Sequence, residues 1–365
     1  MNFEGRIEKL IKLLSNKGLD AAILTNRSNI RYFTGMRFNI TSFSILFVSE
    51  KGNIVFLVPM LDYKRVKKDC WIRDIRQFPE DNPNYLAPLK KVLSDNMACQ
   101  IGVEFPAISI EGENLIKEVT NAILVNIDND LLTLRSIKTK EEVELIRASA
   151  KIADEAMTKA LESVKEGMRE YEVSAIALNV MMNEGAEGPS FEPFVMSGEN
   201  AWLPQRFSSK KELKRGEMIL FDMGCILDGY CSDITRTFSL GGLSDEQKEL
   251  FKIAREAQKS AVAAIKPGIS GEDVDKVARE YIAQKGYGKH FPHLTGHGLG
   301  LSIHEMPILD KGFEVVLEPG MVVTVEPGIY VEGIGAARIE DMVLVTEDGF
   351  SLLTSAPRDL IDIGR

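Results

Sequence analysis

Residues 221–237 read FDMGCILDGYCSDITRT, and this stretch predicts a buried β-hairpin that carries two acidic side chains. The apolar run Met218–Phe221 is typical of a buried strand, and it leads directly into Asp222. Asp228-Gly229 is a two-residue hairpin turn, after which the chain returns as a second strand. In this register Asp222 lies diagonal to Asp233 on one face, with backbones about 7–8 Å apart. Two such carboxylates are able to grip a pair of metal ions about 3.5–4 Å apart.

A second apolar hairpin repeats this arrangement further along the chain. The run Val322–Val325 leads directly into Glu326, and a strand returns after a Gly-rich stretch. A three-residue loop at 332–334 places Glu326 opposite Glu340, although Pro327-Gly328 interrupts regular pairing. A single acid at a strand end is as often a salt-bridged or exposed residue as a ligand. Four acids on two apolar strand pairs instead indicate a metal site, because a buried carboxylate needs a partner.

All four histidines of the chain lie between residues 290 and 304, around the stretch FPHLTGHGLGLSIHEMP at 291–307. Three glycines surround His297, so this segment is not a helix and the histidine spacing is not a helical zinc motif. The glycines instead indicate backbone packed closely against a site. A lone histidine is more often a hydrogen-bonded core residue than a ligand. A cluster in a chain with no other histidines favours a functional site.

The chain predicts two domains of different class. Helix and strand signals alternate up to residue 130, beginning with a helix at 3–17, so we expect a smaller α/β domain over residues 1–130. The second domain, residues 138–365, begins with Thr139-Lys140-Glu141-Glu142, which has the form of a helix capping box.

The second domain contains an internal repeat. Residues 152–185 match a second copy 101 positions later, with Ile152 on Ile253 and Gly167 on Gly268. Each copy reads as a helix, a Gly-containing turn and a second helix. We interpret this as a duplicated half-domain with pseudo-twofold symmetry and a site between the halves; convergence of two amphipathic helix pairs is the alternative.

Composition excludes several classes of protein. The 365 residues are 44% hydrophobic and 27% charged, which is typical of a folded globular chain. A net charge of -10 argues against nucleic-acid binding, which needs clustered Lys and Arg. No apolar run approaches the roughly 20 residues that span a bilayer, and the amino terminus has no signal-peptide pattern. The four cysteines form no CxxC pair, so we expect a reducing, cytoplasmic location.

Several motifs together resemble those of a known family. They are FDMGCILDGYCSDITRT, FPHLTGHGLGLSIHEMP, VEPGIY, RIEDMVLVTEDG, NIRYFTG and LRSIKTKEEVELIR. They resemble the pita-bread metallopeptidases, specifically the Xaa-Pro peptidase branch of aminopeptidase P and prolidase, over nearly the whole chain. The resemblance implies an α+β pita-bread catalytic domain with a pseudo-twofold repeat, preceded by a smaller α/β amino-terminal domain of the creatinase/prolidase type. It also implies a set of ligands for two divalent metal ions: Asp222, Asp233, His297, Glu326 and Glu340.

The same resemblance implies an activity and a role for each site residue. The chain would be an exopeptidase that hydrolyses the bond before proline in short peptides, through a hydroxide bridging two manganese or cobalt ions; ligand softness leaves zinc and iron open. Glu326 would relay a proton to the leaving nitrogen, and His293 and His304 would hold the substrate and stabilise the oxyanion. Tyr330 and Arg338 would orient a ligand carboxylate. The resemblance further implies a homodimer.

Two positions depart from the family pattern. Gln205 stands where the family normally has a substrate-contacting histidine, and glutamine cannot shuttle a proton at neutral pH. Lower turnover, a changed substrate, or a binding role without peptidase activity all remain open. The intact ligand set argues against a creatinase-like reaction on another C–N bond. Ile308 follows Pro307, where prolidases often carry an arginine that holds the carboxylate of a dipeptide; this favours longer peptides but leaves dipeptidase and aminopeptidase P open.

Overall fold

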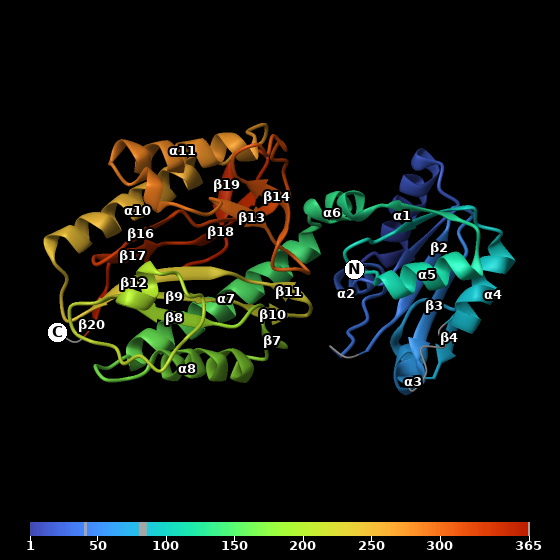
Figure 1. Ribbon diagram of the computed structural model, residues 1–365, viewed down its shortest axis with the longest axis horizontal. Coiled ribbons are helices and arrows are strands. Elements are labelled where there is room, and N and C mark those ends of the chain that lie inside the picture. Colours follow the sequence, from blue (N-terminus) through green and yellow to red (C-terminus); the bar gives the residue numbers. More distant parts are fainter. Residues whose placement is uncertain (40–41, 80–85, 364–365) are drawn as a thin grey trace. The chain divides into compact units, whose positions relative to one another are not determined.

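The computed structural model describes residues 1–39, 42–79 and 86–363, and the chain divides into two compact units. The first unit is Met1–Leu134 and the second is Arg135–Arg365 (Figure 1). Residues Asp128–Ser136, around the predicted end of the first domain at residue 130, form a helix that crosses this division.

The first unit is built on one mixed sheet with helices packed around it. The strands are β1 (Ala21–Leu24), β2 (Ile45–Ser49), β3 (Ile54–Pro59), β4 (Ile75–Phe78), β5 (Gln100–Val103) and β6 (Ile123–Asn126). The helices are α1 (Phe3–Lys17), α2 (Arg27–Thr34), α3 (Met60–Asp69), α4 (Leu86–Asn96), α5 (Ile110–Val119) and α6 (Asp128–Ser136). The strand order is β4-β3-β2-β1-β5-β6, with β1 antiparallel to β2 and parallel to β5. The expected α/β character of this unit is confirmed.

Helix α1 shows how the sequence sets the local structure. The side chain of Asn2 accepts a hydrogen bond from Gly5 N at the start of the helix, and Gly18 ends it in a left-handed conformation (φ 64°). Leu10 and Leu14 are fully buried on one face. The predicted helix at 3–17 is therefore confirmed.

The second unit carries its helices outside and its strands inside. The helices are α7 (Lys140–Ser163), α8 (Glu170–Asn183), α9 (Glu199–Trp202), α10 (Asp245–Ala264), α11 (Gly271–Gln284) and the 3₁₀ helix η1 (Gly288–His290). The strands of its first part are β7 (Gly188–Pro189), β8 (Phe194–Ser197), β9 (Met218–Met223), β10 (Cys225–Leu227), β11 (Tyr230–Cys231) and β12 (Ile234–Leu240). The later strands are β13 (Gly296–Gly298), β14 (Glu305–Leu309), β15 (Val322–Val325), β16 (Gly328–Val331), β17 (Gly335–Arg338), β18 (Asp341–Val345), β19 (Phe350–Leu352) and β20 (Asp362–Ile363).

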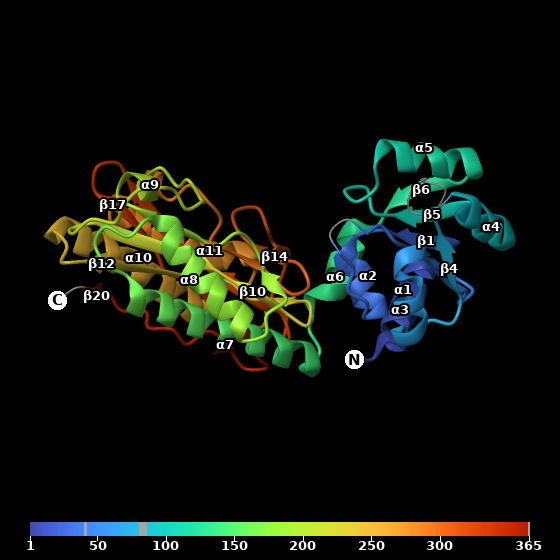
Figure 2. The ribbon, with the colours of Figure 1, turned by 90° about the horizontal axis from the view of Figure 1, so that it is seen from below.

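The sheets of this unit lie between two helix pairs. The main sheets have the orders β20-β12-β9-β8 and β14-β13-β15-β18-β19, and two smaller sheets are β11-β10-β7 and β16-β17. Figure 1 shows α7 and α8 on one side of the strands and α10 and α11 on the other, and Figure 2 shows α7 and α8 from below. This arrangement leaves the inner faces of the strands for a site between the halves.

The predicted repeat is confirmed in the backbone. Helix α8 and helix α11 have the same length and begin 101 residues apart, as do the turns that precede them. Gly167 and Gly268 occupy these turns with left-handed φ of 83° and 87°. Their N–H groups donate to the carbonyls of Leu213 and Leu317, each at 2.9 Å. Both halves therefore repeat the same helix–turn–helix contact to a neighbouring segment.

Strand alternation separates the core from the inner face. Phe221 on β9 packs among alanines of α7, while its neighbour Leu220 packs with Phe194 and Tyr330 on the opposite face. Because side chains alternate along the strand, Asp222 points to the face opposite Phe221, away from α7. Burial of an aromatic side chain such as Phe221 is worth about 1.5–3 kcal/mol, which fixes this strand and its orientation.

Both predicted hairpin registers are confirmed. Leu227 pairs with Tyr230, and Asp222 pairs with Thr235, so Asp233 is the diagonal neighbour of Asp222. At Gly224, a Cβ atom would lie 1.8 Å from the carbonyl oxygen of Ser232, so only glycine permits this close approach.

The second hairpin is split between two sheets at Pro327. Val325 pairs with Asp341 before the proline, and Gly328 pairs with Arg338 after it. The same register holds on both sides, so Glu326 and Glu340 occupy opposing positions, and residues 332–334 form the expected three-residue loop.

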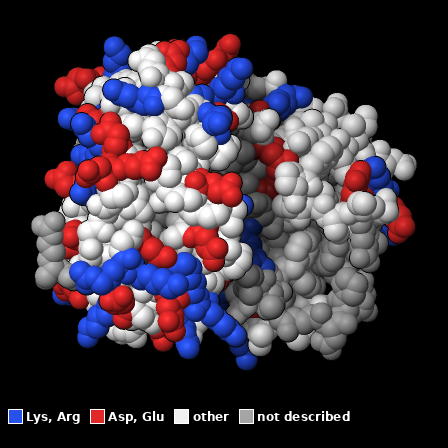
Figure 3. Space-filling model, turned by 60° about the vertical axis from the view of Figure 1, so that its left-hand side comes forward, with Lys and Arg blue, Asp and Glu red and all other residues white. Residues whose placement is uncertain are grey.

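The surface carries both signs of charge. On the face drawn in Figure 3, Lys and Arg side chains gather along the lower edge, and Asp and Glu are scattered above them. Arg169, Lys210, Lys211 and Lys214 line a shallow hollow of the second unit. Among the helices of the described residues, none is long and apolar enough to span a membrane.

Candidate metal centre

Five side chains reach the inner face of the second unit from five strands or from the residues that directly flank them. Asp222 lies near the end of β9, Asp233 directly precedes β12, and His297 is the middle residue of β13. Glu326 follows β15, and Glu340 directly precedes β18. Both halves of the repeat therefore supply ligands. The β9–β12 pair of the first half carries Asp222 and is flanked by Asp233, and the β15–β18 pair of the second half is flanked by Glu326 and Glu340.

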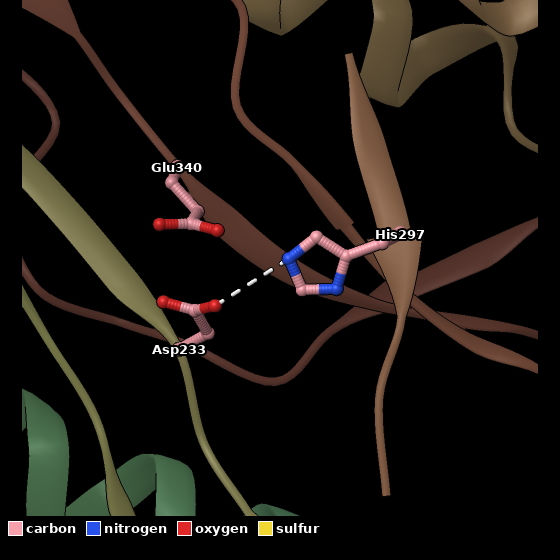
Figure 4. Close-up of side chains that lie close together, drawn as sticks. All are labelled: Asp233, His297 and Glu340. Atoms are coloured by element: carbon pink, nitrogen blue, oxygen red, sulfur yellow. Dashed lines mark ion pairs between the residues drawn. The ribbon is translucent and has the colours of Figure 1, made fainter. Parts of the chain in front are cut away.

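The centre of the cluster is formed by Asp233, His297 and Glu340. Their potential ligand atoms all lie within 4.8 Å of one another, and Figure 4 shows the three side chains converging. His297 Nε2 lies 3.6 Å from Asp233 Oδ2 and 3.4 Å from Glu326 Oε1. All three central residues are at least 95% buried. The sequence analysis had singled out each of these residues.

His297 presents an unprotonated nitrogen to the acids. Its Nδ1 lies 3.0 Å from the carbonyl oxygen of Gly298, and because a carbonyl only accepts, Nδ1 carries the proton. Burial, and then the neighbouring His304, lowers the pKa of His297 to about 4. The ring is therefore neutral at pH 7, and its Nε2 lone pair faces the carboxylates as a metal ligand requires.

The glycines beside His297 allow the backbone to approach neighbouring strands. A Cβ atom on Gly296 would lie 1.9 Å from the carbonyl oxygen of Thr324, and one on Gly298 would lie 2.3 Å from that of Met306. Neither backbone atom is able to move aside cheaply. The close packing inferred from the Gly-rich stretch is thus present on both sides of His297.

Arg338 organises the opposite side of the site. Its Nη2 donates to Asp222 Oδ2, its Nη1 donates to the hydroxyl of Tyr330 at 2.8 Å, and its Nε donates to Thr235 Oγ1 at 3.1 Å. The hydroxyl of Tyr330 donates in turn to His293 Nε2 at 3.1 Å, because His293 Nδ1 faces the carbonyl of Leu294 at 2.8 Å. One chain of hydrogen bonds thus joins His293 to Asp222.

The four acids repel one another in the metal-free protein. Burial, followed by the charges of Glu340 and Asp222, raises the pKa of Asp233 well above its usual range. Burial and the charge of Glu326 do the same for Glu340. Burial raises the pKa of Glu326 to about 7, although Arg338 opposes this shift. The single positive charge of Arg338 therefore does not balance the negative charges of the four carboxylates.

Divalent cations fit this donor set. Asp222 Oδ1 and Glu340 Oε1 are buried and have no hydrogen-bond partner among residues 1–39, 42–79 and 86–363. An orphaned carboxylate oxygen is costly unless a cation binds it. Four carboxylates and one neutral imidazole are the hard-to-intermediate ligands that Mn and Co accept, while Zn and Fe also tolerate them.

Threonines that the sequence analysis missed orient two of the acids. Thr235 Oγ1 donates to Glu340 Oε2 at 2.7 Å, and Thr324 Oγ1 donates to Glu326 Oε1 at 3.3 Å. Thr324 Oγ1 also accepts from His297 N at 3.1 Å. Thr235 lies two residues after Asp233 and so shares the site-facing side of that strand, which is the one signal the sequence offered.

A buried ionic group fixes the segment that carries His304. Glu305 pairs with Arg135 and with Lys138 Nζ at 3.4 Å, and it accepts from Ser302 N at 2.9 Å. Although burial opposes it, the charges of Arg135 and Lys138 lower the pKa of Glu305. His304 itself is exposed, with its ring centroid 4.3 Å from that of His297. The sequence analysis did not foresee these long-range ion pairs.

The site opens into a cavity of about 720 Å³. Its lining includes the expected residues His293, His304 and Gln205 together with four of the five proposed ligands, Asp222, Asp233, His297 and Glu326. Its other lining residues are partly polar, namely Glu192, Arg206, Tyr330 and Arg338, and partly apolar, namely Phe191, Phe194, Pro204, Pro292, Leu294 and Ile303. His290, the one histidine among the described residues that does not line the cavity, hydrogen-bonds through Nδ1 to the Tyr330 carbonyl at 3.1 Å.

Comparison with known families places this geometry in context. Residues 144–347 match the model described as "Metallopeptidase family M24", and residues 6–137 match "Creatinase/Prolidase N-terminal domain". The chain belongs to metallopeptidase family M24. The M24 catalytic unit has the pita-bread fold that the sequence predicted, and the protein is a metallopeptidase, so divalent metal ions are its expected cofactors.

Relatives of this M24 chain align along nearly its full length. It is 37% identical to a Xaa-Pro dipeptidase of Pyrococcus furiosus over 98% of this chain and 99% of the relative. A solved Xaa-Pro dipeptidase from Bacillus anthracis has a TM-score of 0.93 at 35% identity, covering 99% and 100% of the two chains. A solved X-Pro aminopeptidase from Thermotoga maritima has a TM-score of 0.89 at 34% identity, covering 98% and 99%. Both activities thus occur among similar structures.

We predict that Asp233→Asn stabilises the metal-free protein at neutral and higher pH. The folded-state pKa of Asp233 lies above its unfolded value, so ionising this carboxyl lowers the free energy of unfolding as the pH rises through that interval. The variant should raise the Tm measured in chelator by at least about 2 °C near pH 8. The advantage should shrink toward about pH 3, below the pKa of about 3.9 of an unfolded Asp, because Asp233 is then protonated in both the folded and the unfolded wild type.

The exposed Asp359 supplies a matched control for that measurement. Asp359→Asn should leave the Tm unchanged at both pH values. A lower Tm for Asp233→Asn in the metal-free protein near pH 8 would show that the acids are not mutually repulsive.

Proposed function

We propose that the chain hydrolyses the peptide bond before a proline in short peptides, using two divalent ions held by Asp222, Asp233, His297, Glu326 and Glu340. One observation carries this proposal: four acids and a neutral imidazole, with orphaned carboxylate oxygens, lie together beside a cavity that several apolar side chains help to line. The Xaa-Pro dipeptidase relatives at 35–37% identity support the same conclusion.

The bound ions would polarise the scissile carbonyl and supply an acidified water as nucleophile. The protein's part is to hold and orient the reacting groups. Asp233 and Glu340 lie at the centre of the cluster, where they would help to hold the ions. Arg338 holds the Asp222 carboxylate, and Thr235 holds that of Glu340, so neither ligand has to reorganise during the reaction.

Proton transfer and substrate binding are assigned to the rim of the cluster. Glu326, held at Oε1 by Thr324, would receive a proton and pass it to the leaving nitrogen. His293 and His304 line the cavity from two segments and would hold the substrate and the developing oxyanion. The burial-lowered pKa of His293, about 3, keeps this ring neutral, so it would act through hydrogen bonds.

The apolar walls suit a proline ring. Phe191 and Phe194 lie with ring centroids 6.2 Å apart and line the cavity together with Pro204 and Pro292. A pyrrolidine ring has no N–H to satisfy once it is acylated, so an apolar wall accepts it without leaving a buried donor unpaired. We propose Mn or Co as the physiological ions, with Zn and Fe as alternatives to be compared directly.

We also propose that the protein is a homodimer, on the resemblance stated above, and that it is cytoplasmic, because its four cysteines form no CxxC pair. The chain mass is 40.6 kDa. Light scattering of the purified full chain should therefore give about twice that mass, whereas a single-chain mass would contradict the dimer.

The main alternative is a pita-bread protein that retains the metal site but binds peptides without cleaving them. Gln205 motivates it, because this half-buried side chain lines the cavity where the family has a histidine. Glutamine donates a hydrogen bond but does not titrate, so its effect is expected on turnover rather than on metal binding.

A peptide panel tests the proposal against this alternative. The protein is first freed of metal with a chelator and then loaded with Mn, Co, Zn or Fe. It should release the first residue from Xaa-Pro or Xaa-Pro-Yaa peptides but not from Xaa-Ala controls. The ratio of kcat/KM for Xaa-Pro to kcat/KM for Xaa-Pro-Yaa distinguishes a dipeptidase from an aminopeptidase. Glu326→Gln should lower kcat by about 100-fold or more, because it removes both a ligand and a proton carrier.

Assaying Gln205→His beside the wild type separates weak catalysis from none. An increase of about tenfold in kcat would show that the glutamine limits proton transfer or substrate positioning. A wild type that cleaves no proline peptide, and stays inactive as Gln205→His, would favour the binding role and reject the peptidase proposal.

A further inference from the structure

The cavity contains a second arginine, Arg206, which forms no hydrogen bond or ion pair with a proposed metal ligand in the described part of the chain. Arg206 lies between α9 and β9 and lines the cavity together with His293, His304 and Asp222. Its side chain is exposed, and its backbone N–H is 3.2 Å from Met196 Sδ. The sequence analysis considered its neighbour Gln205 but gave Arg206 no role.

The two cavity arginines differ in their partners. Arg338 is committed to Asp222, Tyr330 and Thr235. Arg206, in contrast, forms no ion pair with a carboxylate in the described part of the chain, although the exposed Glu192 lines the same cavity. Arg206 therefore presents an uncommitted guanidinium to whatever enters the cavity.

The positive charge of Arg206 reaches the substrate-facing histidines. Burial lowers the pKa of His304, and the charge of Arg206 lowers it further. His293 is affected in the same sense by burial, by Arg338 and, to a lesser degree, by Arg206. The guanidinium thus lies near the two imidazoles, on the substrate side of the cluster.

The backbone of Arg206 is strained. Its φ of 56° lies in the left-handed region, which is uncommon for a residue with a long side chain. Gln205 N, just before it, donates to the carbonyl of Asn200 at 3.4 Å and helps to hold the segment. Non-glycine residues in this conformation cluster at ligand-binding positions, because the surroundings must hold them there.

We propose that Arg206 binds the free carboxylate of the substrate's proline and thereby selects Xaa-Pro dipeptides over longer peptides. This inference rests on the proposed function. A guanidinium pairs with a carboxylate through two parallel N–H···O bonds, whereas the amide at this position in a longer peptide is neutral. Ile308 offers no charge here, so Arg206 supplies the cation from a different segment of the chain. Ile308 alone led us to expect a preference for longer peptides; with Arg206 in this role we expect a preference for dipeptides instead.

Two variants separate the charge of Arg206 from its effect on the backbone. Arg206→Gly removes the guanidinium and suits the left-handed φ, so it is expected to fold. Arg206→Lys keeps a positive charge but loses the bidentate fork. Lys214→Ala, which removes an exposed cation outside the cavity, is the control.

Each protein is assayed with Ala-Pro and with Ala-Pro-amide, which differ only in the terminal charge. Arg206→Gly should raise KM for Ala-Pro by about 10- to 100-fold and leave KM for the amide within about twofold, since a hydrogen-bonded charge pair is lost only with the acid. Arg206→Lys should fall between Arg206→Gly and the wild type, and Lys214→Ala should match the wild type.

An equal rise in KM for Ala-Pro and Ala-Pro-amide would overturn the proposal. It would show that Arg206 affects the site as a whole, or that it only balances the negative charge of Glu192. An unchanged KM for Ala-Pro in Arg206→Gly would overturn it as well. Calorimetric binding of Ala-Pro to the metal-loaded protein needs no turnover and so separates this inference from the proposed function. If the wild type is inactive, a 10- to 100-fold weaker affinity in Arg206→Gly still supports the contact, and equal affinities reject it.

Discussion

The structure depends on the cost of holding the carboxylates of Asp222, Asp233, Glu326 and Glu340 together in a buried place beside Arg338. Burial and mutual repulsion raise the pKa of Asp233 and Glu340 well above their usual range, and two carboxylate oxygens have no protein partner in the described chain. Such a group persists in a folded protein only where the scaffold is stable enough to bear it and a cation compensates it. The site is therefore unfavourable to the metal-free fold and favourable to metal binding.

The duplicated scaffold meets this cost by placing rigid elements around the acids. Helices α7 and α10 each pack a face of alanines against the strands, which brings the helix axis close to the sheet. Each half then ends its strands at the shared inner face. The acids come from strand ends and the orienting threonines from the same strand faces, so backbone geometry, rather than loop conformation, sets the donor positions. Less regular segments line the cavity beside the acids, and one of them carries Arg206 and Gln205, the latter a departure from the family pattern.

Local rules predicted much of the centre. The Asp228-Gly229 turn and the loop at 332–334 fix strand register, and register alone places Asp222 near Asp233 and Glu326 opposite Glu340. Neither hairpin by itself predicted that the two hairpins meet; that expectation came from the family resemblance. Contacts between distant segments had no local signal: the pairing of Glu305 with Arg135 and Lys138 joins residues more than 160 positions apart. The orientation of Arg206 likewise depends on a left-handed backbone that its residue type disfavours.

The central claim is that the two hairpins and His297 together hold two divalent ions. Elemental analysis of the full chain, saturated with Mn or Co and freed of excess ion, measures this directly. We expect two ions per chain in the wild type and at most one in Asp233→Asn, because Asp233 lies at the centre of the cluster. One ion or none in the saturated wild type, or two in Asp233→Asn, would contradict it.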